Sequence, residues 1–152
     1  GEVDERYHVA ASTRASCAYL REAHERFGSW SLAAASYNMG MAGVSRELEE
    51  QGVAAYWDLH LNPETARYVY RLLAIKEVFE DPARFGFDLA EEALYPPYEV
   101  RELEVSQTIP NLADFARENG TTLKALKTLN PWLTDDFLPI STGNSYRIAL
   151  PA

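Results

Sequence analysis

The sequence predicts an α+β protein with a mainly helical first part and a small second domain of two strands and two helices. Three observations predict this class. Apolar residues recur at helical spacing through most of the first 80 residues. The composition changes at Asp81-Pro82, where prolines and acidic residues begin a connector. Strand-like segments then flank two short helical ones. We therefore expect a helical part over residues 1–86, a linker over 87–98 and a second domain over 99–152.

The first three helices are expected in close succession. One is predicted over Val9–Phe27, and Gly28 is its stop signal. Ser29 can cap the next helix, which begins at Trp30. A third is expected at about Ala42–Gln51, before a further glycine.

The fourth helix has the strongest start signal in the sequence. Asn62 is a good capping residue, Pro63 suits a first helical turn, and Glu64 lies near the positive end of the helix dipole. The helix should run to about Glu80. Its apolar residues lie on two sides, and so wide an arc predicts a helix that is buried on most of its surface; they are Ala66, Val69, Leu72, Leu73, Ile75 and Phe79.

The second domain is predicted from alternation and from turn residues. Strands are expected at Tyr98–Ser106 and Ser145–Leu150, with helices at Pro110–Asn119 and from Thr121 or Thr122 to about Leu129. Two strands alone are marginally stable in water, so both helices should cover one face of the sheet. Four apolar side chains are expected to make that contact: Leu112, Phe115, Leu126 and Leu129.

Composition excludes several classes of function. The 152 residues are 47% hydrophobic and 24% charged, as in a globular protein. They carry 14 basic and 23 acidic residues, a net charge of −9, which argues against nucleic acid as a partner because phosphate contacts need a basic face. The sequence contains no run of about 18 apolar residues, so no transmembrane segment is predicted.

Metal and nucleophile chemistry find no support in the sequence. His8, His24 and His60 share no ligand spacing, so no metal and no cofactor are expected. Cys17 is the one cysteine, and its alanine neighbours favour a small packing residue over a reactive thiol.

Two polar clusters are candidates for a site. Glu64 begins a helix four residues before Tyr68, so the two side chains share a face. Tyr37 and Asn38 follow an alanine-rich helical stretch and precede a glycine, where they could reach into a cleft. The structural alternatives are a dipole-stabilised acid with a core tyrosine, and a helix-capping arrangement. We predict that these four residues converge on one concavity.

Two stretches taken together resemble a known family. SLAAASYNMGMAGV is followed about 25 residues later by NPETARYVYRLLAIKEVF. They are similar to the Ala-x-Tyr-Asn-x-Gly and Glu-Thr-x-x-Tyr-Val motifs of the lytic transglycosylase (SLT, goose-lysozyme-like) domain. The subgroup is the membrane-bound murein transglycosylase D type. The flanking segments STRASCAYLREAHERFGSW and YWDLHLN agree, and the resemblance covers about residues 2–86.

The resemblance implies cleavage of the β-1,4 bond between N-acetylmuramic acid and N-acetylglucosamine in peptidoglycan, with a 1,6-anhydro product. One glutamic acid would protonate the leaving oxygen and then serve as base for the muramyl 6-hydroxyl. Tyr37 would hold that acid and the acetamido group, and Asn38 would brace the cleft turn. Glu64 would reach the cleft floor, and Tyr68 would line it.

The sequence departs from the family at the general acid. The family places it in a Glu-Ser motif near the start of its domain, and these residues contain no Glu-Ser dipeptide. We therefore expect a piece that begins after that motif and is inactive alone, with Tyr37 and Glu64 in supporting catalytic roles; whether it is itself an enzyme stays open. Helix faces left uncovered around Trp30–Ala35 and Leu72–Phe79 would favour self-association. The alternative is a non-catalytic peptidoglycan-binding or scaffold protein.

The second domain resembles a LysM-like module, a βααβ fold that binds N-acetylglucosamine chains. IPNLADFARENGTTLKALKTLNPWL fits its two helices and SYRIALP its final strand. The usual Gly-Asp-Thr after the first strand is replaced by Gln107-Thr108-Ile109-Pro110, so glycan binding there should be weak. Trp132 and Tyr146 could stack on a sugar or pack the core. The resemblance implies peptidoglycan glycan strands as partner and a periplasmic or cell-envelope location, with an outer-membrane anchor in the full-length protein as one alternative.

Overall fold

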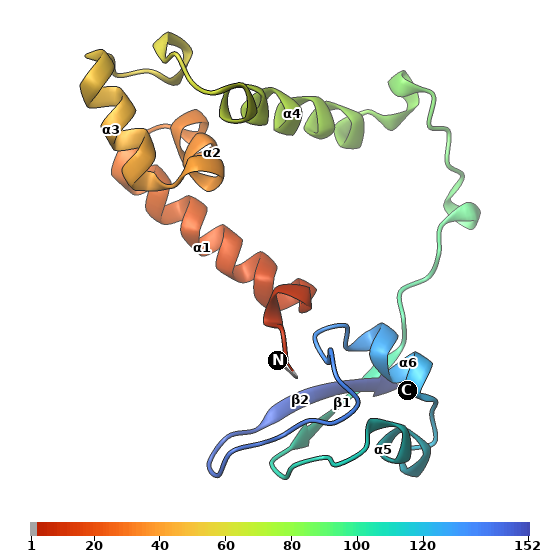
Figure 1. Cartoon of the computed structure of the whole chain (residues 1–152). Coiled ribbons are helices and arrows are strands. Elements are labelled where there is room, and N and C mark those ends of the chain that lie inside the picture. The colour runs from red at the N-terminus through yellow and green to blue at the C-terminus, as the bar shows by residue number, and fades with distance from the viewer. Residues whose placement is uncertain (1–2) are drawn as a thin grey trace. The chain divides into compact units, whose positions relative to one another are not determined.

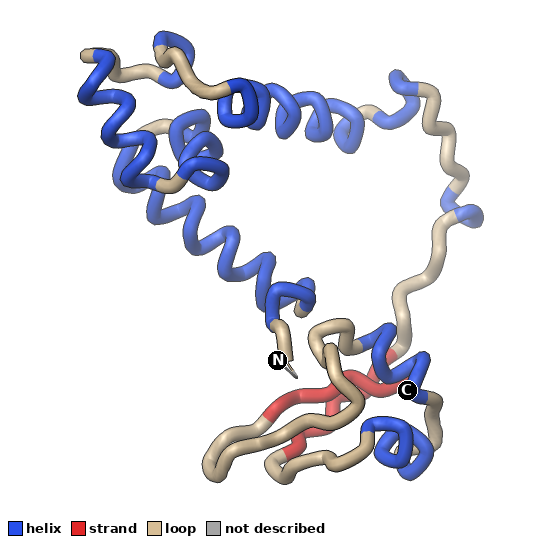
Figure 2. Tube along the Cα trace, viewed as in Figure 1, coloured by secondary structure: helices blue, strands red, loops and turns tan. Residues whose placement is uncertain are grey.

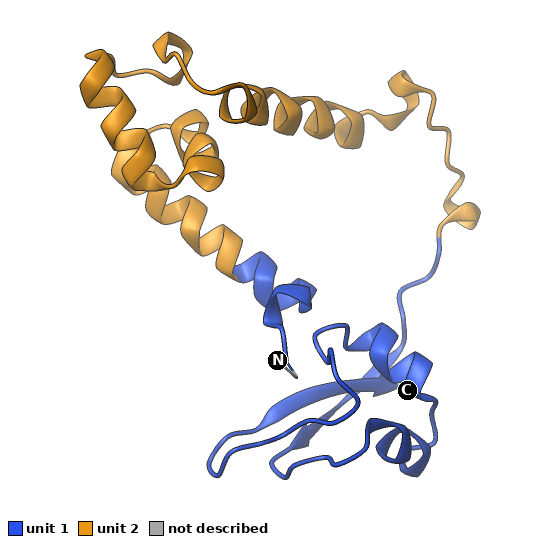
Figure 3. Cartoon of the chain, in the orientation of Figure 1, with its two compact units in different colours: residues 1–14, 95–152 blue, residues 15–94 orange. Residues whose placement is uncertain are grey.

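The computed structural model describes residues 3–152 and has the predicted α+β composition (Figure 2). The chain divides into two compact units, Ala15–Leu94 and the residues up to Arg14 together with Tyr95–Ala152 (Figure 3). The helical unit, Ala15–Leu94, contains most of α1 and all of α2, α3 and α4 (Figures 1 and 3). The first turns of α1, up to Arg14, belong to the other unit. The bounds are Val9–Phe27 for α1, Trp30–Met39 for α2, Met41–Gln51 for α3 and Pro63–Glu80 for α4.

The helix boundaries form where the local signals place them. Ser29 caps α2 by accepting a hydrogen bond from the Leu32 N–H. Gly52 ends α3 in the left-handed conformation, which suits a residue without Cβ. Asn62 caps α4 and accepts from the first two free N–H groups of that helix. Each signal acts within one helical turn, so the sequence is enough to predict it.

The core of the helical unit lies where α2 packs against α3 and α4. Its buried cluster is made of one or two side chains from each element: Leu32, Ala35, Val44, Tyr56 and Val69. Tyr56 comes from the short 3-10 helix Tyr56–Asp58, and its hydroxyl donates to the Ala66 carbonyl at 2.9 Å. Burial raises the pKa of this hydroxyl.

The prediction that α4 is buried on most of its surface is wrong. Only Thr65 and Val69 of α4 are buried, and its C-terminal half exposes apolar side chains. Its partner α2 has 10 residues against 18 in α4, so it is too short to cover the whole length. The exposed set, called here the apolar half of α4, is Leu72, Leu73, Ile75 and Phe79. Of the two helix faces expected to be uncovered, the apolar half of α4 is exposed as expected. In the other, Trp30–Ala35, the expectation is wrong for Leu32, Ala33 and Ala35, which are buried.

The connector after α4 is exposed throughout. It contains two short 3-10 helices, Pro82–Phe85 and Glu91–Ala93, and no buried residue. Among residues 3–152, no helix is long and apolar enough to cross a membrane.

The second unit contains the predicted strand–helix–helix–strand order. Strands β1 (Val100–Val105) and β2 (Tyr146–Pro151) pair antiparallel, with Leu103 opposite Ile148. Helices α5 (Leu112–Glu118) and α6 (Leu123–Leu129) lie between them in sequence. Leu112 and Leu126 are buried in the core and Phe115 packs against it, as predicted. Leu129 is half-buried outside this cluster, and Leu123 packs against the cluster instead.

The N-terminal segment packs on this second unit. Val3 forms a bridge with Leu133, and the Asp4 N–H donates to the Trp132 carbonyl at 3.0 Å. The Trp132 ring stacks with His8 at 6.0 Å and with Tyr146 at 5.5 Å between centroids. At 3% exposure, Trp132 is a core residue, so of the two expected roles the structure selects packing. The second unit therefore includes the residues up to Arg14, which the sequence analysis assigned to the helical part over residues 1–86.

Candidate functional site

The end of α2 meets the start of α4 through side-chain hydrogen bonds. The Asn38 amide Nδ2 donates to Glu64 Oε1 at 3.4 Å, and the Thr65 hydroxyl donates to Asn38 Oδ1 at 2.7 Å. These partners are 26 and 27 residues apart in sequence. The close packing of the alanine-rich α2 against α4 therefore brings the two quoted motifs together.

Tyr37 lies beside this pair and contacts α1. Its hydroxyl is 2.6 Å from the Ser16 hydroxyl, and its ring meets Tyr19 edge to face at 5.5 Å. The Tyr19 hydroxyl in turn donates to the Ser36 carbonyl at 2.7 Å. Tyr37 is 45% exposed, so one side of the ring is held by α1 while the rest is open to a ligand.

Tyr68 follows Glu64 by about one turn of α4 and is half-buried. Burial raises the pKa of its hydroxyl, and the nearby Tyr37 hydroxyl adds to that rise. A tyrosine whose pKa is raised stays protonated at neutral pH and can donate a hydrogen bond. The structure thus joins Asn38 to Glu64 and places Tyr37 near Tyr68. The convergence of the four residues on one concavity, and their catalytic and binding roles, stay predictions.

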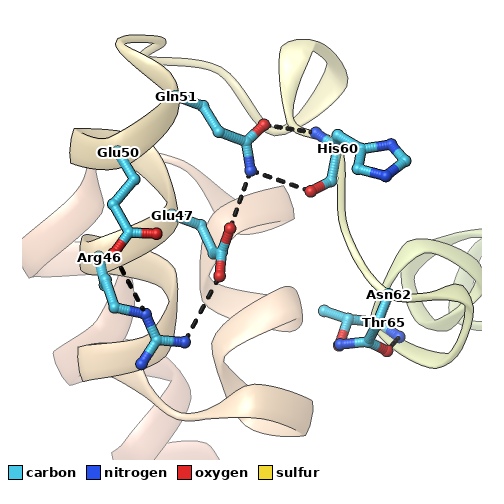
Figure 4. Close-up of polar contacts among 7 residues, drawn as sticks. All are labelled: Arg46, Glu47, Glu50, Gln51, His60, Asn62 and Thr65. Carbon is cyan, nitrogen blue, oxygen red and sulfur yellow. Dashed lines mark hydrogen bonds and ion pairs between the residues drawn. The ribbon is translucent and has the colours of Figure 1, made fainter.

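The connector before α4 is held by the end of α3, as Figure 4 shows. Gln51 donates to the His60 carbonyl at 2.9 Å and accepts from the His60 N–H at 2.8 Å. Gln51 also donates to Glu47, which pairs with Arg46 (Figure 4). This contact holds the chain two residues before Asn62, the residue that caps α4.

No metal site is visible in the part of the chain that the structure describes. There, no three His, Cys, Asp or Glu side chains come close enough together to hold an ion. Cys17 is exposed on α1, so the expectation of a packing residue is wrong.

The altered loop of the second unit lines a shallow cavity of about 360 Å³. The Thr108 hydroxyl accepts from the Ile140 N–H at 3.0 Å, and Ile109 forms a bridge with Leu138, so the loop is tied to the segment before β2. Asp114 and Glu118 lie at the same cavity. Gln107 and Asn111, whose amides can donate and accept hydrogen bonds, line the same cavity, and weak glycan binding there stays a prediction.

Two family models match separate parts of this chain. Residues 1–60 match the transglycosylase SLT domain, and residues 101–152 match the soluble lytic transglycosylase C-terminal LysM-like domain. The predicted resemblance to lytic transglycosylases is confirmed.

Two relatives with the same name come from two strains of Escherichia coli. The membrane-bound lytic murein transglycosylase D of Escherichia coli (strain K12) is 28% identical over 132 residues, which cover 84% of this chain and 28% of the relative. The protein of that name from Escherichia coli O6:H1 gives the same values. The chain therefore spans under a third of the length of these relatives.

Sequence reasoning missed three residues of the candidate site. Ser16 and Tyr19 lie on α1, and nothing in its sequence shows which face meets Tyr37. Thr65 lies inside the Glu-Thr-x-x-Tyr-Val motif, so that motif could have indicated it as a site residue. Its role is visible only in the structure, where Thr65 is fully buried between Asn62 and Asn38.

Proposed function

We propose that this chain is part of a peptidoglycan lytic transglycosylase, and that its helical unit supplies one side of the glycan site. The whole activity is cleavage of the bond between N-acetylmuramic acid and N-acetylglucosamine with a 1,6-anhydro product. The observation that carries the proposal is the contact of Asn38 with Glu64, which joins the two family motifs. The two family matches and the names of the relatives support it.

Each site residue has a role in this proposal. The Tyr37 hydroxyl hydrogen-bonds the substrate acetamido group and the general acid, Asn38 and Glu64 form the polar floor, and Tyr68 offers a ring face to a sugar. The sequence contains no Glu-Ser dipeptide, so Tyr37 and Glu64 act in support of an acid that these residues do not provide. Glycan strands are the partner and the cell envelope is the location.

A titration with a tetramer of N-acetylglucosamine tests the glycan site. In amide NMR spectra of the 152-residue chain, we expect shifts at Tyr37, Asn38, Glu64 and Tyr68. Asn38→Ala should weaken binding by up to about tenfold, because one hydrogen bond is worth about 0.5–1.5 kcal/mol. The matched control is Asn144→Ala, since Asn144 is exposed in the other unit.

Two outcomes would contradict this assignment. Shifts confined to residues 99–152 would favour the non-catalytic binding or scaffold protein. Release of anhydro-muropeptides from purified sacculi by this chain alone would show that its own residues supply the general acid.

The apolar half of α4 is the surface for the proposed self-association. Exposed apolar patches of this kind are uncommon on soluble monomers. In sedimentation velocity, the mass of the wild-type chain should rise with concentration, and Ile75→Glu should keep it monomeric. Leu94→Glu is the control, because Leu94 is a similarly exposed apolar residue in the connector. A wild-type chain that stays monomeric at high concentration would contradict the proposal.

A further inference from the structure

We propose that Asn62 and Thr65 are positioning residues that fix the amide orientation of Asn38, so that its NH2 group faces Glu64 and the glycan. This inference rests on the proposed function for the identity of the ligand. The orientation itself follows from the hydrogen bonds at the start of α4, which link Asn62, Thr65 and Asn38. In this chain, each side chain fixes whether the next one donates or accepts.

The first orientation is set by the backbone. Asn62 Oδ1 lies 3.1 Å from the Glu64 nitrogen and 3.0 Å from the Thr65 nitrogen. Both are N–H groups that can only donate, so the Asn62 oxygen must face them. Its NH2 group therefore points the other way and donates to the Thr65 hydroxyl oxygen at 2.9 Å.

The second orientation follows at Thr65. Its hydroxyl has one proton, and its oxygen already accepts from Asn62. The proton is thus free to be donated to Asn38, 2.7 Å away, and the acceptor there must be the amide oxygen. Thr65 is fully buried, so no water can replace either partner without a void or an unpaired group.

The third orientation is that of Asn38. With its oxygen held by Thr65, the amide can present only N–H donors on its other side. One of them faces Glu64 Oε1 at 3.4 Å, a long hydrogen bond. The site therefore offers a donor to a bound glycan, which suits a hydroxyl or an acetamido carbonyl oxygen and disfavours a donor group at that point.

Asn62→Asp tests this chain of hydrogen bonds while it keeps the helix cap. Asp caps helices as well as Asn does, but its carboxylate cannot donate. The Thr65 hydroxyl should then donate to the introduced carboxylate, and Asn38 should turn its NH2 group toward Thr65. In wild-type NOE spectra, the Asn38 NH2 protons should contact the Glu64 side chain more strongly than the Thr65 methyl. In Asn62→Asp this order should reverse, with helix content unchanged.

Thr65 variants and glycan binding complete the experiment. Thr65→Ser keeps the hydroxyl and should retain the wild-type NOE pattern, whereas Thr65→Val should lose it. If the wild-type chain binds the tetramer, Asn62→Asp and Thr65→Val should weaken binding by up to about tenfold and Thr65→Ser should not. An unchanged NOE pattern in Asn62→Asp would overturn the positioning role. No binding by the wild-type chain would instead overturn the proposed function and leave the NOE comparison valid.

Discussion

Trp132→Ala is expected to destabilise the second unit by about 3–5 kcal/mol, the range measured for removal of a large buried aromatic side chain. The ring belongs to the main apolar cluster of this unit and is 3% exposed. It also holds the N-terminal segment through the stack with His8 and packs on Tyr146 of β2. Its loss should free that segment and loosen one end of the sheet. Because the chain has two units, denaturant unfolding should be followed at the amides of β1 and β2.

The matched control for Trp132 is an aromatic residue that packs on nothing. Tyr95→Ala removes a side chain that is 98% exposed, and its effect should stay within about 0.5 kcal/mol. A change at Trp132 as small as that at Tyr95 would show that the ring does not belong to the folded core.

Asn130→Ala is expected to cost about 3 kcal/mol or more in the same unit, because its buried amide satisfies several backbone groups. Asn130 is 1% exposed, and its amide joins the end of α6 to β2. It donates to the Leu126 and Ala149 carbonyls at 2.9 and 2.6 Å, and it accepts from the Ala149 N–H at 2.8 Å. Alanine would leave the Ala149 carbonyl and N–H without this partner, and each such buried group costs about 1–3 kcal/mol. The Leu126 carbonyl would keep its hydrogen bond from the backbone N–H of residue 130.

The measurement is again unfolding reported by β2, together with hydrogen exchange at Ala149. In Asn130→Ala the Ala149 amide proton should exchange much faster than in the wild-type chain. Asn144→Ala, at an exposed site, should change neither quantity. Retained protection of the Ala149 amide in Asn130→Ala would mean that another group holds this strand edge.

The sequence by itself determined the α-helices and strands and, to within one or two residues, their limits. The α1 bounds agree with the prediction, and the starts of α2 and α4 follow from Ser29 and Asn62. The pairing of the two strands was also predicted, because the sequence of the second domain offers each strand only the other one as a partner. The shared face of Glu64 and Tyr68 follows from helical spacing alone. All of these features depend on residues within a few positions of one another or on one small domain.

Tertiary structure alone decided which of these surfaces meet. An apolar arc shows which side of a helix avoids water, but it does not show whether a partner covers that side, and α2 is too short to cover the apolar half of α4. For the same reason, the sequence did not show that the N-terminal segment contacts Trp132. Nor did it show the orientation of Asn38, which depends on a hydroxyl 27 residues away. Hydrogen-bond direction is settled by groups that only folding brings together, so no local pattern in the chain can encode it.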